Sequence, residues 1–517
     1  MFKLVLFILF LCSFSVSGQT NLNMILGTEK AVPIMGYNAN MAHAPSWRNT
    51  DFTNALNKLN PKILRYPGGS NSFYWDWKKG WTKSYEDFYP HLEASQFLHQ
   101  GNPINSPEQL KEIATNNKKE DAFWRQLSRY NAKKPKYNTL ADFSIGIKQT
   151  ESDAIFCLNL ISSSISNEMK MLKKAAEEGI SIKYIELGNE LNGSSLLSKH
   201  FYPTTQSYVD TCLKWAKAIW EVFPHAEIGL IGGDKRKKDW NKKLTSAFQT
   251  IFPNKQDQIS FILHYYTHFK KPSFNLSSPN EYKQLIGLPH LDVSKKLNHW
   301  NWNETKDFTT WVTEYNVIEK KPHEINNSWA HGLFISNQIH QLLHQTKATI
   351  FNFHNIGSDA FPGFAALDLM NEDERYLQPT APGIVTSLWN KLTVDAENLY
   401  NINLNNQVWE VHYPSKHTCD CPNNPQIPTT IEFNPVHAYK SSNQQQQKLL
   451  ICNSSEKAFQ LTLNDIEMSG GKMEQYSGNL RHDVRGDLYQ GNDWKVTKTT
   501  VNNTIEIPPY SITLIEE

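Results

Sequence analysis

The sequence predicts an α/β protein: a (β/α)8 TIM barrel over residues 33–394, followed by a C-terminal antiparallel β-sandwich over residues 395–517. Three observations support this fold class. Eight short apolar runs alternate with helix-like segments through the first domain. An open doubly wound sheet would carry a glycine-rich nucleotide loop, and none accompanies these runs. Beyond about residue 395, strand-like runs are separated by polar turns, which is typical of antiparallel sheets.

The chain begins with an apolar segment before the first predicted domain. Residues 1–18, MFKLVLFILFLCSFSVSG, place one lysine before an apolar run that ends in small residues. This pattern is typical of a secretory signal peptide and is too short for a stable transmembrane helix. We therefore expect a secreted or exported protein without a later membrane span, in which residues 19–32 add a strand to the sandwich. The net charge of the 517 residues is only +1, which gives no indication of a nucleic-acid partner.

The predicted barrel strands are short runs rich in branched and aromatic residues. They cover residues 33–40, 62–66, 154–161, 183–188, 227–232, 259–266, 309–315 and 349–355. Between them, apolar residues at positions i, i+3 and i+4 predict amphipathic helices, for example at 167–179, 204–223 and 328–346. The segment 78–150 after the second strand is long and rich in Asn, Lys and Tyr, and it predicts an insertion with helices over the barrel mouth.

Cysteine usage indicates a thiol-containing core rather than a metal centre. Five cysteines follow the signal peptide, an odd number, so at least one is free or pairs between chains. Cys157 lies in a buried-strand pattern and is predicted to be a core thiol. One disulfide can form among Cys419, Cys421 and Cys452. The Cys-Asp-Cys spacing lacks further zinc ligands, so we expect no metal and no cofactor.

The ends of the predicted strands identify the candidate site, because barrels of this type hold their chemistry at the carboxyl face of the strands. When every strand end is listed, polar side chains predominate at this face. The candidates are Asn38 on strand one, Arg65 on strand two with Trp75 shortly after it, Asn189 and Glu190 on strand four, His264, Tyr265 and Tyr266 on strand six, Glu314 on strand seven and His354 on strand eight.

Two glutamates at opposed strand ends favour glycoside hydrolysis. One carboxyl protonates the leaving oxygen, and the other attacks the anomeric carbon or activates water. The two roles require one glutamate to stay protonated and the other to stay ionised. Arg65 and a tyrosine hydroxyl near Glu314 would favour its charged form.

The motifs around both glutamates resemble those of clan A glycoside hydrolases. In that clan an Asn-Glu pair ends strand four and a second Glu ends strand seven, as in IELGNE and WVTEYN here. The segment LRYPGGSNSFYWDW (64–77) is similar to the strand-two motif of α-L-arabinofuranosidases, and IELGNE also resembles the motif of heparanase and β-glucuronidases. The resemblance implies a retaining mechanism with Glu190 as acid/base and Glu314 as nucleophile. It further implies that Asn189 binds the sugar 2-hydroxyl and that Tyr266 or Tyr265 orients Glu314.

Simpler interpretations exist for the remaining candidates. Arg65 also fits a structural ion pair, and His264 and His354 also fit satisfied core histidines. Asn38 either binds sugar hydroxyls or caps a turn. Trp75 and Trp77 fit sugar platforms or covers of the barrel end, and alternation along a strand predicts one of each.

Charge placement gives a clue to the substrate. Basic runs at 235–238, 270–271 and 319–321 follow strands five, six and seven in a chain that is almost neutral. Positive charge around the mouth would attract an anionic polysaccharide or oligosaccharide, such as a uronic-acid or sulfated glycan. Surface lysines are also an ordinary feature of soluble proteins. The alternatives are a neutral-glycan enzyme, such as an α-L-arabinofuranosidase or β-xylosidase, and a carbohydrate-binding protein without turnover.

Overall fold

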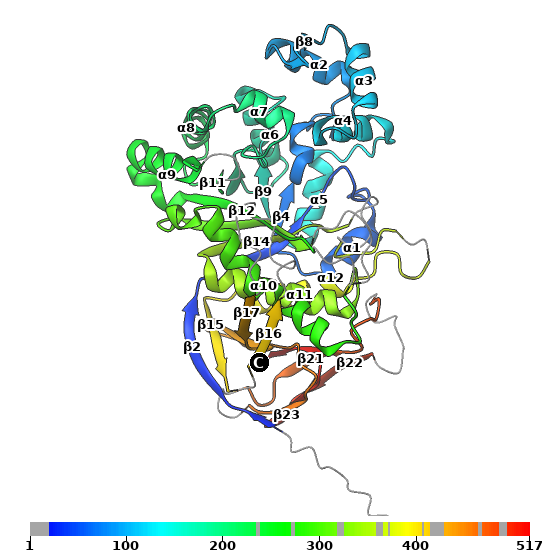
Figure 1. Cartoon of the computed structure of the whole chain (residues 1–517), viewed down its shortest axis with the longest axis vertical. Helices are drawn as coiled ribbons and strands as arrows, with labels where there is room; N and C mark the ends of the chain where they lie inside the picture. Colours follow the sequence, from blue (N-terminus) through cyan, green and yellow to red (C-terminus); the bar gives the residue numbers. More distant parts are fainter. Residues whose placement is uncertain are drawn as a thin grey trace, which may run out of the picture.

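The protein has two domains, a barrel and a sandwich, joined along one side (Figure 1). The computed structural model describes residues 20–233, 238–269, 274–317, 325–357, 365–370, 373–405, 408–413, 429–463, 468–484 and 494–517. The predicted signal peptide 1–18 lies outside these residues. No helix in the described ranges is long and apolar enough to cross a membrane.

Eight parallel strands close into a barrel, as predicted. In chain order they are β3 (Ile34–Asn38), β4 (Ile63–Tyr66), β9 (Asp153–Cys157), β10 (Tyr184–Glu186), β11 (Glu227–Ile231), β12 (Ile259–Thr267), β13 (Thr309–Val317) and β14 (Ala348–Phe353). Each strand pairs with the next, and β14 returns to β3. Every predicted strand overlaps one of these eight, so apolar runs of this length were sufficient to locate the barrel.

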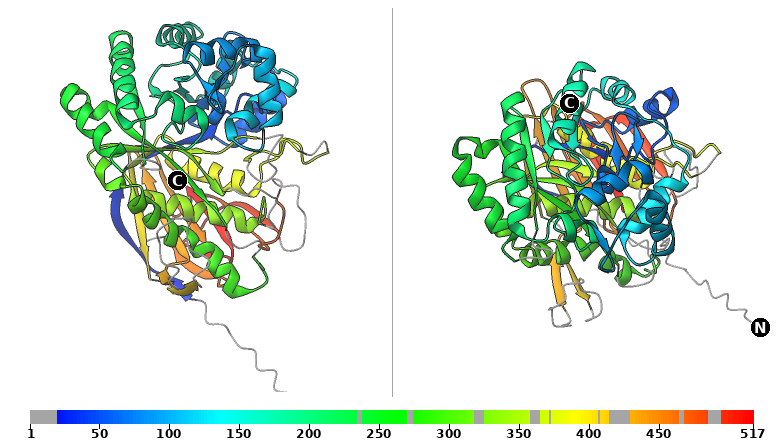
Figure 2. Two further views of the ribbon diagram at one scale, coloured as in Figure 1. Left: turned by 45° about the horizontal axis from the view of Figure 1, so that its top comes forward. Right: turned by 90° about the horizontal axis from the view of Figure 1, so that it is seen from above.

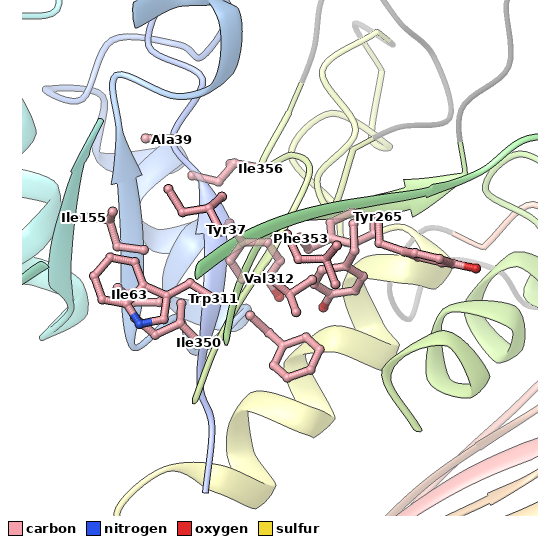
Figure 3. Packing of buried hydrophobic residues seen from close by; sticks show 14 of the residues in the cluster. Tyr37, Ala39, Ile63, Ile155, Tyr265, Trp311, Val312, Ile350, Phe353 and Ile356 are labelled. Atoms are coloured by element: carbon pink, nitrogen blue, oxygen red, sulfur yellow. The ribbon is translucent and has the colours of Figure 1, made fainter. Parts of the chain in front are cut away.

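The interior of the barrel is filled by side chains from its strands. Trp311 and Ile350 are in register on neighbouring strands, are at most 1% exposed and lie inside, where the ring of Trp311 meets that of Tyr184 from β10 (Figure 3). Phe353 belongs to the same cluster but packs with Tyr37 on the outer face of the strands, under the helices. Because large side chains fill the interior, the barrel is a packed core, and polar chemistry is confined to the ends of the strands.

Amphipathic helices return the chain between the barrel strands. They are α1 (Thr50–Lys58), α5 (Leu140–Thr150), α6 (Ile165–Glu177), α8 (Thr205–Val222), α9 (Trp240–Ile251), α10 (Pro279–His299), α11 (Trp329–Gln345) and α12 (Ala381–Thr393), with the short α7 (Leu196–Phe201) after β10. In α6, Ser164 caps the first turn, and Met171, Leu172 and Ala175 form the buried stripe. The apolar residues whose spacing predicted this helix are therefore the ones that it buries.

An insertion separates β4 from α5. It contains the hairpin β5 (Trp75–Asp76) and β6 (Trp81–Thr82), then α2 (Tyr85–Ala94), the hairpin β7 (Leu98–His99) and β8 (Asn102–Pro103), α3 (Pro107–Asn116) and α4 (Ala122–Ala132). The sequence placed its end at residue 150, but α5 is one of the helices that surround the barrel. Figure 1 and the left view of Figure 2 show the insertion and the sandwich at opposite ends of the molecule.

The second domain is built mainly from antiparallel strands. Seven form one sheet in the order β2 (Met24–Lys30), β15 (Asn398–Leu404), β18 (Val436–Ser442), β19 (Gln447–Asn453), β24 (Ser511–Glu516), β21 (Lys472–Ser477) and β22 (Lys495–Thr500). The other sheet contains β1 (Thr20–Leu22), β20 (Phe459–Thr462) and β23 (Thr504–Ile507). An apolar cluster that includes Leu22, Ile451 and Ile507 forms its core. A separate hairpin, β16 (Trp409–Tyr413) and β17 (Thr429–Phe433), contacts α10.

The N-terminal segment belongs to this second domain. β1 pairs in parallel with β20, and β2 pairs antiparallel with β15. The three cysteines in the described part of the chain, Cys157, Cys212 and Cys452, are free and buried. Cys452 therefore takes no part in the expected disulfide, and Cys419 and Cys421 lie outside the described residues.

Candidate active site

The carboxyl ends of the barrel strands surround a polar cavity of about 480 Å³. Its lining includes both predicted glutamates together with His264, Tyr266 and His354. His264 on β12 is paired in register with Glu314 on β13, so the two side chains leave neighbouring strands at the same level. The structure thus brings five of the predicted site residues to one cavity.

Glu314 is a buried carboxylate held by two donors. Its side chain points inward from β13, and the residue is only 6% exposed. Arg65 donates from Nη1 to Oε1 at 2.8 Å, and the hydroxyl of Tyr266 donates to Oε2 at 2.5 Å. The two oxygens are therefore fixed in one orientation, which is the arrangement that a nucleophilic carboxylate requires.

The surroundings keep Glu314 ionised. Burial alone would raise its pKa, but the charges of His264, His354 and Arg65 outweigh burial and bring the pKa well below its usual range. Burial lowers the pKa of His354 itself, so this ring is neutral at neutral pH. Burial opposes the charge of Arg65, but Glu186, Cys157 and Glu314 raise its pKa further, so Arg65 stays charged and supports the ionised form of Glu314 whatever the state of the histidines.

Glu190 has the opposite environment. It follows β10 in the left-handed region, with a φ of 44°, and its side chain is 39% exposed. Two residues earlier Gly188 has a φ of 87°, and a Cβ there would lie 2.6 Å from Leu191 Cδ1, so only glycine fits this turn. The turn directs an accessible carboxyl into the same cavity as the buried one.

The histidine between the two glutamates limits their separation. Nδ1 of His264 lies 3.2 Å from Oε1 of Glu190 and 3.8 Å from Oε2 of Glu314. These two oxygens are therefore no more than about 7 Å apart. Retaining glycosidases hold their carboxyl groups roughly 5–5.5 Å apart and inverting ones roughly 6.5–9.5 Å, so the limit excludes most of the inverting range.

Arg65 is the centre of a buried network rather than a residue that faces the cavity. It is fully buried and is bound on its far side by Glu186, at 2.8 Å from Nε and 2.7 Å from Nη2. Nη1 also donates to Oδ1 of Asn38 at 2.8 Å, and Nη2 to Oδ1 of Asn189 at 2.9 Å. One guanidinium thus orients Glu314 and the asparagine that precedes Glu190.

Glu186 was not among the site residues that the sequence predicted. It is fully buried in an otherwise apolar strand, where a charge requires a partner of opposite sign. That requirement was the available signal, because Arg65 stands in the equally buried β4.

Three predicted substrate contacts need correction. Asn38 is fully buried, and its amide is used up by Arg65 and by the carbonyl of Thr313, at 2.7 Å. Trp75 is 4% exposed and donates its indole N–H to the hydroxyl of Tyr66 at 2.6 Å. Both residues support the barrel end and do not line the cavity.

Tyr265 is the third correction. Adjacent strand residues point to opposite faces, so Tyr265 and Tyr266 cannot both reach the cavity. Tyr266 points inward to Glu314, whereas Tyr265 is fully buried against α10 and donates to Asp292 at 3.0 Å. Since His264 is two residues before Tyr266, the same alternation puts both on the inner face.

The basic loops used for the substrate prediction lie mostly outside the described residues. Only Lys238 of these three runs is described. The sequon at Asn192 beside Glu190 is described, and it is 1% exposed with its amide donating to the carbonyls of Gly232 and Gly233, at 2.9 and 2.7 Å. In the folded protein this amide is inaccessible to a glycan.

Replacement of Arg65 by methionine should destabilise the fold strongly. It would leave Glu186 buried without a counter-charge, and breaking a buried ion pair in this way costs about 3–5 kcal/mol. Arg48→Met is the matched control, because Arg48 pairs with Asp142 from a side chain that is 70% exposed, and such pairs contribute about 1 kcal/mol or less. Urea denaturation followed by tryptophan fluorescence measures both. Equal losses for the two variants would contradict the account of Arg65.

Solved structures with the same architecture are known. The chain is similar to the GH51 α-L-arabinofuranosidase of Thermotoga petrophila RKU-1 (12% identity, 96% of this chain and 99% of that chain, TM-score 0.60). It is also similar to a 4-O-α-L-rhamnosyl-β-D-glucuronidase of Fusarium oxysporum 12S (13%, 96% and 99%, 0.54) and to the catalytic domain of GH30 xylanase C of Talaromyces cellulolyticus (12%, 96% and 99%, 0.52). By sequence, no family model and no curated protein matches the chain.

These likenesses extend over nearly the whole chain and include the kinds of enzyme whose motifs the sequence resembles. At identities of 12–13% they establish the fold and leave the chemistry to be argued from the site. The chain therefore shares the barrel-and-sandwich fold of these glycoside hydrolases.

Proposed function

We propose that the protein is a retaining glycoside hydrolase that cleaves a polysaccharide or oligosaccharide by double displacement. The observation that carries the proposal is the pair of carboxyl groups around His264. Glu314 is buried, ionised and fixed by two donors, whereas Glu190 is accessible and faces the same cavity. A carbohydrate-binding protein without turnover has no use for two carboxyl groups with such different environments.

In the first step, a carboxylate oxygen of Glu314 attacks the anomeric carbon and forms a glycosyl ester. The bond to the leaving oxygen breaks as Glu190 gives that oxygen its proton. In the second step, Glu190 takes a proton from water, the water oxygen attacks the anomeric carbon, and Glu314 is released as a carboxylate. The charge of Glu190 acts to raise the pKa of Glu314, but His264, His354 and Arg65 outweigh it, so Glu314 is the carboxyl that suits the ionised role.

Neighbouring residues support these roles. Tyr266 and Arg65 fix the oxygens of Glu314 and stabilise its charge when it leaves the sugar. His264 contacts Glu190 through Nδ1, while Nε2 lies 3.2 Å from the hydroxyl of Thr313, so the ring is anchored behind the acid/base. Since Arg65 holds Oδ1 of Asn189, the amide N–H groups of this residue remain to donate to a sugar hydroxyl.

For the substrate we propose only a class of glycan. Two structural neighbours are enzymes of neutral sugars by name, and another is a glucuronidase. The basic runs of the sequence favour an acidic glycan, with a neutral arabinofuranoside or xyloside as the alternative. The apolar segment 1–18 supports export of the enzyme to meet such a polymer.

The stereochemistry of the first product tests the mechanism. Hydrolysis of an accepted aryl glycoside, followed by proton NMR, should first give the sugar in the anomeric configuration of the substrate, because two inversions restore it. Appearance of the opposite anomer first would contradict the double displacement. Absence of hydrolysis across a broad panel of glycosides and polysaccharides would instead favour the binding protein.

A further inference from the structure

A second cavity, of about 470 Å³, continues from the first. The two share Ser70, Arg125, Gln126 and Glu190 in their linings, but only the first reaches Glu314. On the proposed function, Glu314 binds the sugar whose bond is cleaved and Glu190 protonates the leaving group. The cavity that contains Glu314 therefore holds the attacked sugar, and the cavity beyond Glu190 holds the leaving group.

Helix α4 of the insertion runs beside both cavities and carries opposite charges along its length. Glu120 and Asp121 precede its first turn and line only the leaving-group cavity. Arg125 lines both cavities, and Arg129 lines only the cavity of the attacked sugar. From Asp121 to Arg129 the helix rises about 12 Å, a span over which its charge changes sign.

The positive end of α4 is reinforced by further cations. Nη2 of Arg129 lies 3.3 Å from Nε2 of His43, and Nζ of Lys133 lies 3.0 Å from Nδ1 of the same ring. Nζ of Lys136 donates to the backbone carbonyl of His43 at 2.8 Å. Three cations thus gather around His43, which lines the cavity of the attacked sugar together with Arg129.

Arg125 is available to a ligand. It is exposed at the junction of the cavities, and among the described residues it forms no ion pair. By contrast, Lys296 in the wall of the first cavity is engaged with Asp292 at 2.6 Å and with the carbonyl of Tyr266 at 2.5 Å. A forked guanidinium at this position suits a carboxylate or sulfate oxygen pair.

We propose that Arg125 and Arg129 select a sugar bearing a carboxylate or sulfate for the position attacked by Glu314, and that Glu120 and Asp121 select against an anionic leaving group. This inference rests on the proposed function and adds to it a direction along the substrate. The enzyme would then cleave after an acidic residue and before a neutral one. The α4 insertion, and not the barrel itself, would set the specificity.

Matched pairs of 4-nitrophenyl glycosides test the first half of the inference. The members of a pair differ only in carrying a carboxylate or a hydroxymethyl group on the same ring carbon, as in glucuronide against glucoside and galacturonide against galactoside. The wild type should prefer an acidic member. Arg125→Gln and Arg129→Gln should each lower kcat/KM for that member about tenfold or more and leave the neutral member nearly unchanged. Added salt should reduce the preference.

Lys111→Gln is the matched control, since Lys111 is an exposed cation on α3 of the same insertion and lines neither cavity. It should change neither rate. For the second half, a carboxylate added to the phenyl leaving group should lower kcat/KM, and Glu120→Gln should restore part of the loss.

The inference is overturned if the wild type prefers no acidic member, or if the arginine variants lower kcat/KM equally for the acidic and the neutral member of a pair. Its failure is distinguishable from failure of the proposed function. If the wild type preferred the neutral members and Glu314→Gln lost this activity, the proposed glycosidase function would stand and the proposed preference for an acidic sugar would be wrong. If acidic saccharides bound through Arg125 but were never cleaved, the proposed glycosidase function would be wrong and the preference for acidic saccharides would stand.

Discussion

Glu314→Gln should abolish turnover while the protein stays folded. Glutamine keeps the shape of the side chain, and its carbonyl oxygen still accepts from Arg65, but an amide cannot form the glycosyl ester. We expect kcat to fall by about 10⁴-fold or more, because the covalent route is lost altogether. The change in stability should be small, since Arg65 keeps Glu186 as its counter-charge. Steady-state rates and urea denaturation of the same preparation measure both quantities.

Glu397→Gln serves as the control for this experiment. Glu397 is exposed at the start of the sandwich, far along the chain from the cavity, so its replacement should leave both rate and stability unchanged. If Glu314→Gln retained wild-type activity, Glu314 would be a structural partner of Arg65 only. If the variant unfolded, Glu186 alone would not be a sufficient counter-charge for the buried Arg65.

Glu190→Ala should produce a different defect, which depends on the leaving group. Loss of general acid catalysis costs about 10²–10⁴-fold when the leaving oxygen needs a proton. A dinitrophenyl leaving group needs none, so its release should be much less affected and the glycosyl ester on Glu314 should accumulate. A burst of dinitrophenolate followed by slow turnover, measured in a stopped-flow instrument, is the expected signature.

Azide separates the acid/base role from damage to the site. Azide needs no deprotonation and fits the space left by the Glu190 carboxyl, so it should restore turnover of the Glu190→Ala variant and give a glycosyl azide of retained configuration. The same addition should not rescue Glu314→Gln. A uniform loss over all leaving groups, without azide rescue, would show that Glu190 only shapes the cavity.

The barrel and the positions of both glutamates could be predicted because they depend on local patterns. Apolar runs of strand length alternate with 3.6-residue periodicity, and parallel strands must all end at one face. The order of the strands therefore brings Glu190 and Glu314 to one mouth, although they are 124 positions apart in the sequence.

The rest of the site depends on orientation, which residue type alone does not give. Alternation says that Tyr265 and Tyr266 face opposite sides, and choosing the inner one requires the phase of β12, which Glu314 reveals through its bond to Tyr266. Asn38 looked like a sugar ligand because it stands at a strand end, yet it is buried and accepts a hydrogen bond from Arg65. Arg65 in turn holds Glu314, as the sequence predicted, and also Asn189. The sequence did predict helices of an insertion over the barrel mouth, and α4 lies there. Which of its side chains line the cavities depends on tertiary contacts that no periodicity within α4 encodes.

Identification of the residue that carries the sugar tests the central claim most directly. An accepted aryl glycoside in which fluorine replaces the 2-hydroxyl slows breakdown of the glycosyl ester, so the intermediate can be digested and located by tandem mass spectrometry. The mass of one fluorosugar should be found on the peptide that contains Glu314, and Glu314→Gln should remain unlabelled. Labelling of Glu190, or hydrolysis without any covalent intermediate, would contradict the assignment of the two glutamates.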